Sequence, residues 1–325
     1  MNVRALITGI SGQDGGLMAL RLIQSGAHVL GLSRNPSAAW QQLPSLVSEN
    51  LHIEQLNVAT TGAIAAQIED FQPDLIFNFA AHATGSGMFD APQEMSRLNG
   101  TFVLDILEAI RNSPRREKMR FVQASSSEMF GHVDTPKQDE TTPLRPKSPY
   151  GAAKAYAHHM IGIYRNTWGI HASSAILYNH ESIRRSHHFV TRKIAQSAVR
   201  IKLGLQTHLE LGTLDATRDW GHAEEYVEAM HLIALAPKAD DYVVATGQAQ
   251  SLRHVCEVAF AELGLDWQEY VRVDKRVARA VQSAGLLGDP SKIKRKLGWQ
   301  ARRGIDQIMP ELVAHEMELH LKRTE

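Results

Sequence analysis

The sequence has little of several features that would point to particular functions. Its 325 residues include one cysteine, Cys256, which excludes an internal disulfide framework and a thiolate zinc cluster and favours a reducing compartment. Lysine plus arginine and aspartate plus glutamate each total 35, so no overall attraction to nucleic acid or membranes is expected. No run reaches the roughly 18 apolar residues of a membrane span, and the N-terminus lacks a signal-peptide pattern. We therefore expect a cytoplasmic protein.

Short apolar runs alternate with helical patterns through the first half of the chain. The runs that favour strands are residues 5–7, 29–32, 75–79 and 120–123. The helical patterns cover about 15–25 and 99–110. Strands separated by helices favour right-handed crossovers and a parallel sheet with helices on both faces. The sequence therefore predicts an α/β fold with a Rossmann-type doubly wound parallel sheet.

A glycine-rich turn follows the first predicted strand. Gly9, Gly12 and Gly15 are spaced Gly-x-x-Gly-x-x-Gly between that strand and the next helix. Glycines here let the backbone approach a pyrophosphate, which the unpaired N–H groups at the helix N-terminus can bind. An ordinary glycine-rich turn is the alternative, but the position after the first strand favours a dinucleotide site.

The second predicted strand ends at Arg34, at the place where an NAD site normally carries an acidic residue for the ribose 2′-hydroxyl. A guanidinium would instead pair with a 2′-phosphate through charge-assisted hydrogen bonds, each contributing about 1.5–3 kcal/mol. A solvated loop arginine is the alternative. The sequence therefore favours NADP as the cofactor.

The chain length suggests about two domains. After residue 178 the pattern becomes less regular and more basic. We expect an NADP-binding Rossmann domain over residues 1–177, with returning segments at about 215–260, and a smaller C-terminal substrate-binding lobe, mainly 178–325. Such a lobe would close over the carboxyl ends of the strands, where open α/β sheets bind ligands.

A long helix is predicted to begin at Ser148 as N-cap, with Pro149 in its first position, and to end near Gly169. Tyr150 and Lys154 then lie one turn apart on the same face. An ammonium beside a phenol can lower its pKa, which would make the phenol a proton donor or acceptor near neutral pH. Helices also carry this pair by chance, so the pattern alone is weak.

Three serines and a glutamate follow the strand predicted at 120–123. Ser126 and Glu128 would lie at the carboxyl end of that strand, where such sheets place their catalytic groups. A polar turn and a solvated carboxylate are the alternatives. The combination with the glycine turn and with Tyr150 and Lys154 favours one catalytic site.

These motifs together resemble the extended short-chain dehydrogenase/reductase family and, within it, the GDP-mannose 4,6-dehydratase branch. The sequences GQDG, NHES and RDWGHA are typical of that branch. The similarity extends over nearly the whole chain. The matching segments are residues 7–15, 121–131, 148–157, 178–185, 189–194, 218–230 and 288–299.

The resemblance implies a reaction and a role for each catalytic residue. The sugar would lose a hydride from C4 to NADP, water would be eliminated across C5 and C6, and the hydride would return to C6. Tyr150 would take the O4 proton, with Ser126 hydrogen-bonded to O4. Lys154 would lower the pKa of the phenol and hold the nicotinamide ribose. Glu128 would remove the C5 proton and assist loss of the C6 hydroxyl.

The resemblance also implies the binding residues. A nucleotide-diphosphate sugar, GDP-linked in this branch, would be the substrate. The expected NADP site comprises Gly9, Gly12, Gln13, Asp14, Gly15, Arg34, Tyr150 and Lys154. The expected substrate site comprises Asn179, Val190, Lys193, Arg218 and Arg279. The three cations suit a diphosphate because guanidinium and ammonium donors meet phosphate oxygens.

The chain departs from the branch in three places. His82, Thr84 and Met88 stand where the branch carries Gln, His and a sugar-contacting Ser, so an altered sugar pocket is expected. Gln282 replaces a glutamate that helps to hold the nucleotide. The loop over 35–40 is abbreviated, which favours a homodimer, with a tetramer as the alternative.

Other functions stay open from the sequence. A GDP-sugar 4-reductase or epimerase would share the fold, and a regulator that binds nucleotide sugars or NADP(H) would need no catalysis. No metal site is expected. The pairs His158–His159 and His187–His188 lack a supporting carboxylate or cysteine at ligand spacing.

Overall fold

A seven-stranded parallel sheet forms the centre of the computed structural model, which describes residues 3–42, 48–60, 62–82, 89, 91–274 and 285–322. The strand order is β10-β6-β5-β4-β1-β2-β3. This is the doubly wound order extended by one strand, so the predicted fold class is confirmed. The strands are β1 (Arg4–Thr8), β2 (His28–Ser33), β3 (Leu51–Gln55), β4 (Leu75–Asn78), β5 (Arg120–Ser126), β6 (His171–Leu177) and β10 (Tyr242–Val244).

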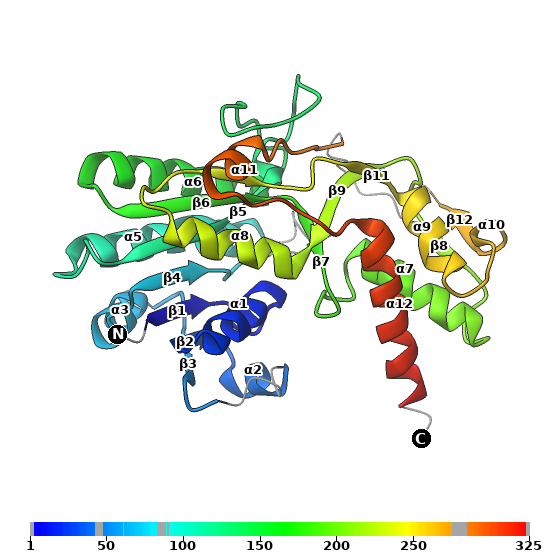
Figure 1. The fold of residues 1–325 in the computed structure, drawn as a ribbon, viewed down its shortest axis with the longest axis horizontal. Coiled ribbons are helices and arrows are strands. Elements are labelled where there is room, and N and C mark those ends of the chain that lie inside the picture. Colours follow the sequence, from blue (N-terminus) through cyan, green and yellow to red (C-terminus); the bar gives the residue numbers. More distant parts are fainter. Residues whose placement is uncertain are drawn as a thin grey trace.

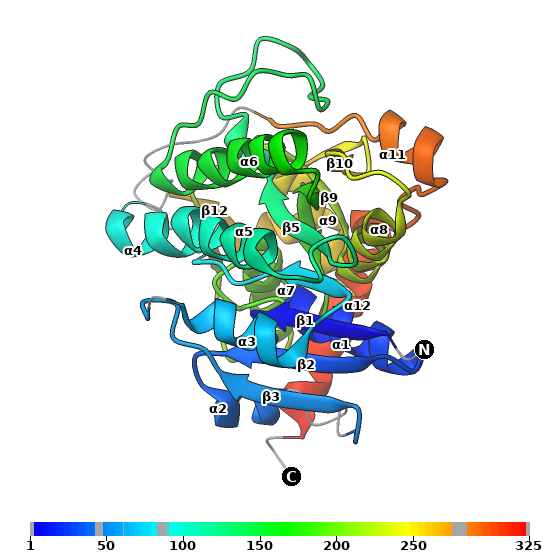
Figure 2. The same cartoon turned by 90° about the vertical axis from the view of Figure 1, so that its left-hand side faces the viewer.

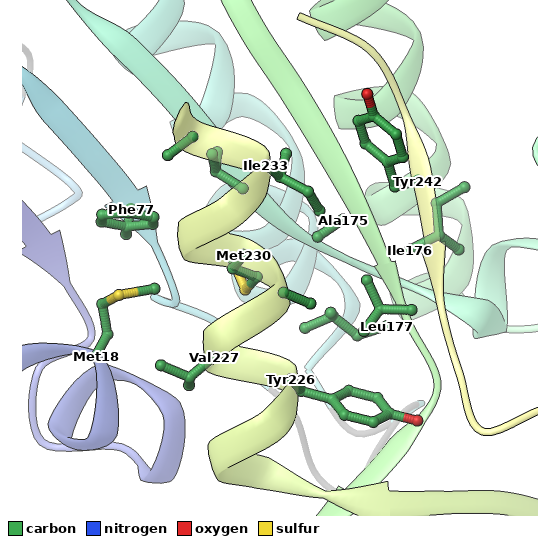
Figure 3. Packing of buried hydrophobic residues seen from close by; sticks show 14 of the residues in the cluster. Met18, Phe77, Ala175, Ile176, Leu177, Tyr226, Val227, Met230, Ile233 and Tyr242 are labelled. Carbon is green, nitrogen blue, oxygen red and sulfur yellow. The ribbon is translucent and has the colours of Figure 1, made fainter. Parts of the chain in front are cut away.

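Helices cover both faces of this sheet (Figure 2). One layer holds α3 (Ala63–Phe71), α5 (Phe102–Asn112) and α6 (Pro149–Trp168), and the other holds α1 (Gln13–Gln24) and α8 (Ala223–Leu235). Side chains alternate between the faces because a strand has a period of two. Leu6 joins the apolar cluster of the α5 layer, and Ile7 joins that of the α1 and α8 layer. Figure 3 shows Met230 of α8 among the residues of this second cluster.

The long helix α6 has the predicted ends. The Ser148 hydroxyl accepts a hydrogen bond from the N–H of Gly151 at 3.1 Å, and Pro149 is the first helical residue. Gly169 terminates the helix with a positive φ of 66°. The helix predicted at 99–110 is present as α5 over 102–112, and a π-helical turn, η2 (Arg97–Thr101), leads into it.

A smaller lobe lies beyond the carboxyl ends of the sheet strands, at the right of Figure 1. Three of its helices, α7 (Val190–Lys202), α9 (Leu252–Ala261) and α12 (Ile305–Leu321), share an apolar cluster of their own. Two small sheets have the orders β11-β9-β7 and β12-β8. Their strands are β7 (Asn179–Glu181), β8 (Leu209–Leu211), β9 (Thr217–His222), β11 (Ala249–Ser251) and β12 (Val271–Val273).

Four short α-helices complete the described secondary structure of the whole chain. They are α2 (Pro36–Gln42), α4 (Pro92–Ser96), α10 (Trp267–Tyr270) and α11 (Ser291–Leu297).

The chain returns from the lobe to complete the central sheet. After β9 it forms α8, which packs on α1, β5 and β6, and then β10, which pairs with β6 in parallel. Val243 of β10 is in register with Ile176. No helix in the described part of the chain is long and apolar enough to cross a membrane.

Candidate active site

The glycine turn has the close approaches that the sequence predicts. Gly9 has φ of +72°, and a Cβ built there would lie 2.7 Å from the backbone nitrogen of Ala80. A Cβ on Gly15 would lie 2.3 Å from the carbonyl oxygen of Gly9. Only glycine fits at these two positions, because the turn brings backbone segments so close together. Helix α1 begins within the turn, at Gln13.

A cavity of about 270 Å³ opens in front of this turn. Arg34, at the end of β2, is one of its lining residues, and its guanidinium lies 3.6 Å from the Glu94 carboxylate. The arginine side chain is 76% exposed, so solvent screens this ion pair strongly. The other lining residues include Gly9, Ser11, Gly12, Leu32, Asn35, Val58 and Ala81.

A chain of hydrogen bonds crosses the carboxyl ends of the three central strands. The hydroxyl of Thr8 on β1 donates to the side-chain oxygen of Asn78 on β4. The Asn78 amide donates to Gln123 on β5 at 2.7 Å, and the Gln123 amide donates to the carbonyl oxygen of Ala124 at 2.8 Å. Lys154 Nζ donates to the same carbonyl at 2.9 Å. The strand before the glycine turn is thus connected to the lysine of α6.

Lys154 and Tyr150 lie together at the start of α6, as predicted. The lysine is 2% exposed, and its Nζ lies 5.8 Å from the centroid of the Tyr150 ring. An ammonium can donate three hydrogen bonds, and among the described residues that of Lys154 donates to the Ala124 carbonyl. The buried ammonium therefore has donors available for ligand hydroxyls.

Burial controls the pKa values of both groups. It raises the pKa of the Tyr150 phenol to about 12, while the hydrogen bond with Ser126 lowers it and the charge of Glu128 raises it. Burial lowers the pKa of the Lys154 ammonium to about 8. The sequence pattern predicts a lowered pKa for the phenol, but in this structure desolvation of the ring outweighs the hydrogen bond with Ser126 and the charge of Arg185, which both lower it.

Glu128 lies on a single turn, η3 (Ser127–Met129), directly after β5. The Ser126 hydroxyl caps this turn by accepting from the N–H of Glu128 at 3.2 Å. The turn packs tightly on α6, since a Cβ on Gly151 would lie 2.5 Å from the Glu128 carbonyl oxygen. The structure thus brings the hydroxyl, carboxylate, phenol and ammonium predicted from the sequence to one place.

Gln13 and Asp14, predicted to hold the cofactor, also contact the lobe. The Gln13 amide donates to Asp14 at 3.0 Å and to the His180 carbonyl at 3.1 Å, and its oxygen accepts from Ser182 at 2.9 Å. Nε2 of His180 lies 2.9 Å from Asp14 Oδ2. The sequence indicates His180 and Ser182 only as members of the NHES motif, within the matched segment 178–185.

The predicted substrate residues come from three adjacent elements. Asn179 begins β7, and it is in register with Trp220 of β9, the strand that also carries Arg218. Val190 begins α7, and Lys193 on that helix donates to the Glu210 carbonyl at 2.8 Å. Thr191 of α7 donates to Glu181 of β7 at 2.7 Å, so α7, β7 and β9 lie next to one another. Arg279, Thr84, Met88 and Gln282 lie outside the described residues.

His82, which stands where the GDP-mannose 4,6-dehydratase branch carries another residue, lies near the cavity. His82 follows β4, and its Nδ1 lies 3.8 Å from the same Glu94 oxygen that faces Arg34. The described residues hold no group of three or more His, Cys, Asp or Glu side chains placed to bind a metal ion.

The chain matches one protein family over nearly its whole length. The model of the family described as GDP-mannose 4,6 dehydratase matches residues 6–312. The chain belongs to this family. The resemblance to the extended short-chain dehydrogenases/reductases and to this branch is therefore confirmed. GDP-mannose 4,6 dehydratase 1 of Arabidopsis thaliana is 40% identical over 327 residues, covering 97% of this chain and 90% of the relative.

Solved structures share the fold of the family. The dTDP-glucose 4,6-dehydratase of Bacillus anthracis in complex with NAD superimposes with a TM-score of 0.84 at 18% identity, covering 99% of this chain and 100% of that one. RMD from Pseudomonas aeruginosa complexed with NADPH gives 0.79 at 20% identity, covering 98% and 100%. The fold is therefore shared by proteins that hold either form of the nicotinamide cofactor.

Proposed function

We propose that the chain is a nucleotide-sugar 4,6-dehydratase that uses NADP and acts on a GDP-linked hexose such as GDP-mannose. The observation that carries the proposal is the meeting of four groups at the end of β5 and the start of α6. These groups are the Ser126 hydroxyl, the Glu128 turn, the Tyr150 phenol and the Lys154 ammonium. They occur in a chain whose family match covers residues 6–312.

The residues present fit a nicotinamide dinucleotide. The glycine turn permits close backbone approach, and the N-terminus of α1 favours a pyrophosphate. The buried Lys154 ammonium has donors to offer to ribose hydroxyls. A nicotinamide bound here would supply the hydride exchange that the reaction needs, out of sugar C4 and back to C6. The protein must therefore move protons, hold the sugar and exclude water.

Tyr150 is placed to take the proton from O4 as C4 is oxidised. Its hydrogen bond with Ser126 means that the serine hydroxyl would lie next to the same sugar oxygen. The pKa of the phenol, about 12, means that the phenol is protonated near neutral pH before ligands bind. A cationic environment favours the phenolate, and the Lys154 ammonium is the cation that α6 supplies there.

Glu128 distinguishes a dehydratase from a simple reductase. A ketone at C4 acidifies the C5 proton, and a carboxylate beside the sugar can then remove that proton and assist loss of the C6 hydroxyl. The turn that carries Glu128 packs on Gly151, next to Tyr150 in α6, and the charge of Glu128 contributes to raising the pKa of that phenol. One side chain can thus serve C5 and C6 while the other serves O4.

Glu128→Gln tests this division of roles. The amide keeps the shape but cannot accept the C5 proton, so we expect hydride to leave C4 and the cofactor to stay reduced, with absorbance at 340 nm persisting. Deuterium exchange at C5 in heavy water should fall by about 10²–10⁴, the usual contribution of a general base. Glu117→Gln, at an exposed position, should behave as wild type.

The outcomes separate the candidate functions. Wild type should convert GDP-mannose to a product 18 Da lighter, with no net change in cofactor absorbance. Net consumption of NADPH with a GDP-linked 4-keto sugar would instead indicate the 4-reductase, and an isomer of unchanged mass would indicate the epimerase. Exchange at C5 in Glu128→Gln at the wild-type rate would show that Glu128 is not the base.

NADP is favoured over NAD because Arg34 lines the cavity at the end of β2. Its fork of N–H donors can pair with a 2′-phosphate after leaving the exposed pair with Glu94. Arg34→Ala should weaken NADP binding about tenfold or more and leave NAD binding unchanged. Calorimetric titration of both cofactors measures this, with the exposed Arg116→Ala as control. Equal affinities in wild type would refute the preference.

The GDP moiety and the assembly are the remaining parts of the proposal. Lys193, Arg218 and Arg279 are proposed to bind the diphosphate. The first two are supported by the adjacency of α7, β7 and β9. The homodimer stays a prediction. Three exposed apolar side chains on α6, those of Tyr156, Ile163 and Trp168, support it because a second copy could cover them.

A further inference from the structure

Both ring nitrogens of His180 face hydrogen-bond acceptors. Nδ1 lies 2.7 Å from the carbonyl oxygen of Tyr178, and Nε2 lies 2.9 Å from Asp14 Oδ2. A carbonyl oxygen cannot donate, and neither can an ionised carboxylate. Neutral imidazole carries a single N–H, so both contacts are hydrogen bonds only when the ring is an imidazolium. The geometry therefore assigns a positive charge to His180.

The surroundings of His180 agree with this assignment. Its side chain is 10% exposed, and that of Asp14 is 21% exposed. The Tyr226 ring of α8 stacks on the imidazole at 4.7 Å between centroids. Burial and the charge of Arg185, after β7, lower the pKa of His180, but the charge and hydrogen bond of Asp14 raise it above its ordinary value. The pKa of Asp14 is lowered, since its pairing with His180 outweighs burial.

The pair joins the two sides of the site. Asp14 is in the first turn of α1, beside the glycine turn, and His180 is the middle residue of β7. β7 pairs with β9, which carries Arg218. Glu181 accepts from Thr191 at the start of α7 at 2.7 Å. β7 is thus the strand through which the cofactor turn contacts the predicted substrate elements.

We propose that His180 is a positioning residue whose imidazolium fastens the glycine turn to β7, so that cofactor binding and nucleotide binding favour each other. The choice of ligands rests on the proposed function. Ordering the turn also orders β7, since Asp14 and Gln13 both bond to it. The second ligand then meets a site that is already ordered, which gives positive coupling.

Two substitutions of His180 separate its two hydrogen bonds. The amide nitrogen of glutamine takes the place of Nε2, so His180→Gln keeps the bond to Asp14 and loses the bond to Tyr178. The amide nitrogen of asparagine takes the place of Nδ1, so His180→Asn keeps the local bond and loses the bridge. Both are neutral amides, which makes them a matched pair.

Titration calorimetry of GDP with and without saturating NADP measures the coupling. We expect NADP to tighten GDP binding at least fivefold in wild type and in His180→Gln, and to have no effect in His180→Asn. In wild type the coupling should fall, though not to zero, as pH rises through the raised pKa of His180, because the neutral ring has one N–H to share between the Asp14 and Tyr178 acceptors. In His180→Gln the coupling should not change over that pH range.

A merely structural role predicts a different pattern. It would weaken both ligands equally in the two variants and leave the coupling unchanged, which would overturn the inference. If His180→Asn fails to fold, Asp14→Ala, which removes the acceptor of the bridge, must abolish the coupling in its place. Wild type that binds both ligands without coupling also overturns the inference. Failure of wild type to bind GDP would refute the proposed nucleotide instead.

Discussion

At the residue scale, the buried polar side chains at the ends of the central strands depend on one another. Thr8, Asn78 and Gln123 are each 0% exposed, and burial of an unpaired polar group is costly. Each is paired with the next, and the series ends at the Ala124 carbonyl that also holds Lys154. The chain of hydrogen bonds therefore both removes that cost and fixes the lysine.

Replacing the middle member should be the most damaging change. Asn78→Leu keeps the branched shape of the side chain but leaves the Thr8 O–H without its acceptor and the Gln123 oxygen without its donor, at about 1–3 kcal/mol each. We expect urea unfolding to show a loss of about 2–5 kcal/mol. Asn112→Leu, at the exposed end of α5, should change stability by less than about 0.5 kcal/mol. A loss in Asn78→Leu no larger than in this control would contradict the proposed dependence.

Residues that belong to a local motif could be predicted from the sequence, and isolated polar residues could not. Tyr150 and Lys154 lie four positions apart, which a helix converts directly into proximity. Asn78 and Gln123 are separated by 45 positions, and Asp14 and His180 by 166. Nothing in the local pattern records such pairs, because they form only when the strands assemble.

At the element scale, the ends of α6 follow from sequence, but its packing does not. Ser148 and Gly169 have cap chemistry that can be read locally. Gly151 is required for a different reason, since its backbone faces the carbonyl oxygen of Glu128. Gly162 in the same helix has no atom closer than 3.9 Å to a built Cβ, and that atom is the end of the Arg165 side chain.

These two glycines should respond oppositely to alanine. Gly151→Ala places a Cβ 2.5 Å from backbone, so η3 must shift, and we expect a loss of about 1–3 kcal/mol and at least a tenfold fall in turnover. Gly162→Ala should raise stability by about 0.4–1 kcal/mol with unchanged turnover. Thermal unfolding and steady-state kinetics measure both. Wild-type turnover in Gly151→Ala would show that η3 need not be held in place.

At the scale of the whole molecule, the central sheet is completed by distant segments. The three residues of β10 are too few to give a periodic pattern, although they form one edge of the sheet. The face of α8 toward the sheet carries Val227, Met230 and Ile233, which are at most 2% exposed (Figure 3). The alternation of strands and helices in the first half of the chain predicts much of the rest of the sheet, because its strands are longer than β10 and give a recognisable apolar run.

The first 177 residues should therefore not fold alone. A chain ending at Leu177 lacks α8 and β10, so it exposes the apolar face on α1 and leaves the edge of β6 unpaired. We expect this fragment to aggregate, or to bind a hydrophobic dye and unfold without cooperativity, while the full chain unfolds cooperatively. A soluble fragment with a sharp thermal transition would contradict this expectation.

The late position of β10 in the chain also affects folding during synthesis. β6 ends at Leu177 and its partner begins at Tyr242, 65 positions later. At about 5–20 residues per second, a ribosome needs roughly 3–13 s to make that stretch. Throughout that interval the nascent chain presents an uncovered strand edge and an apolar layer without α8. The fold thus creates a defined period in which a chaperone has a surface to bind, and that period closes when residue 244 has left the ribosome.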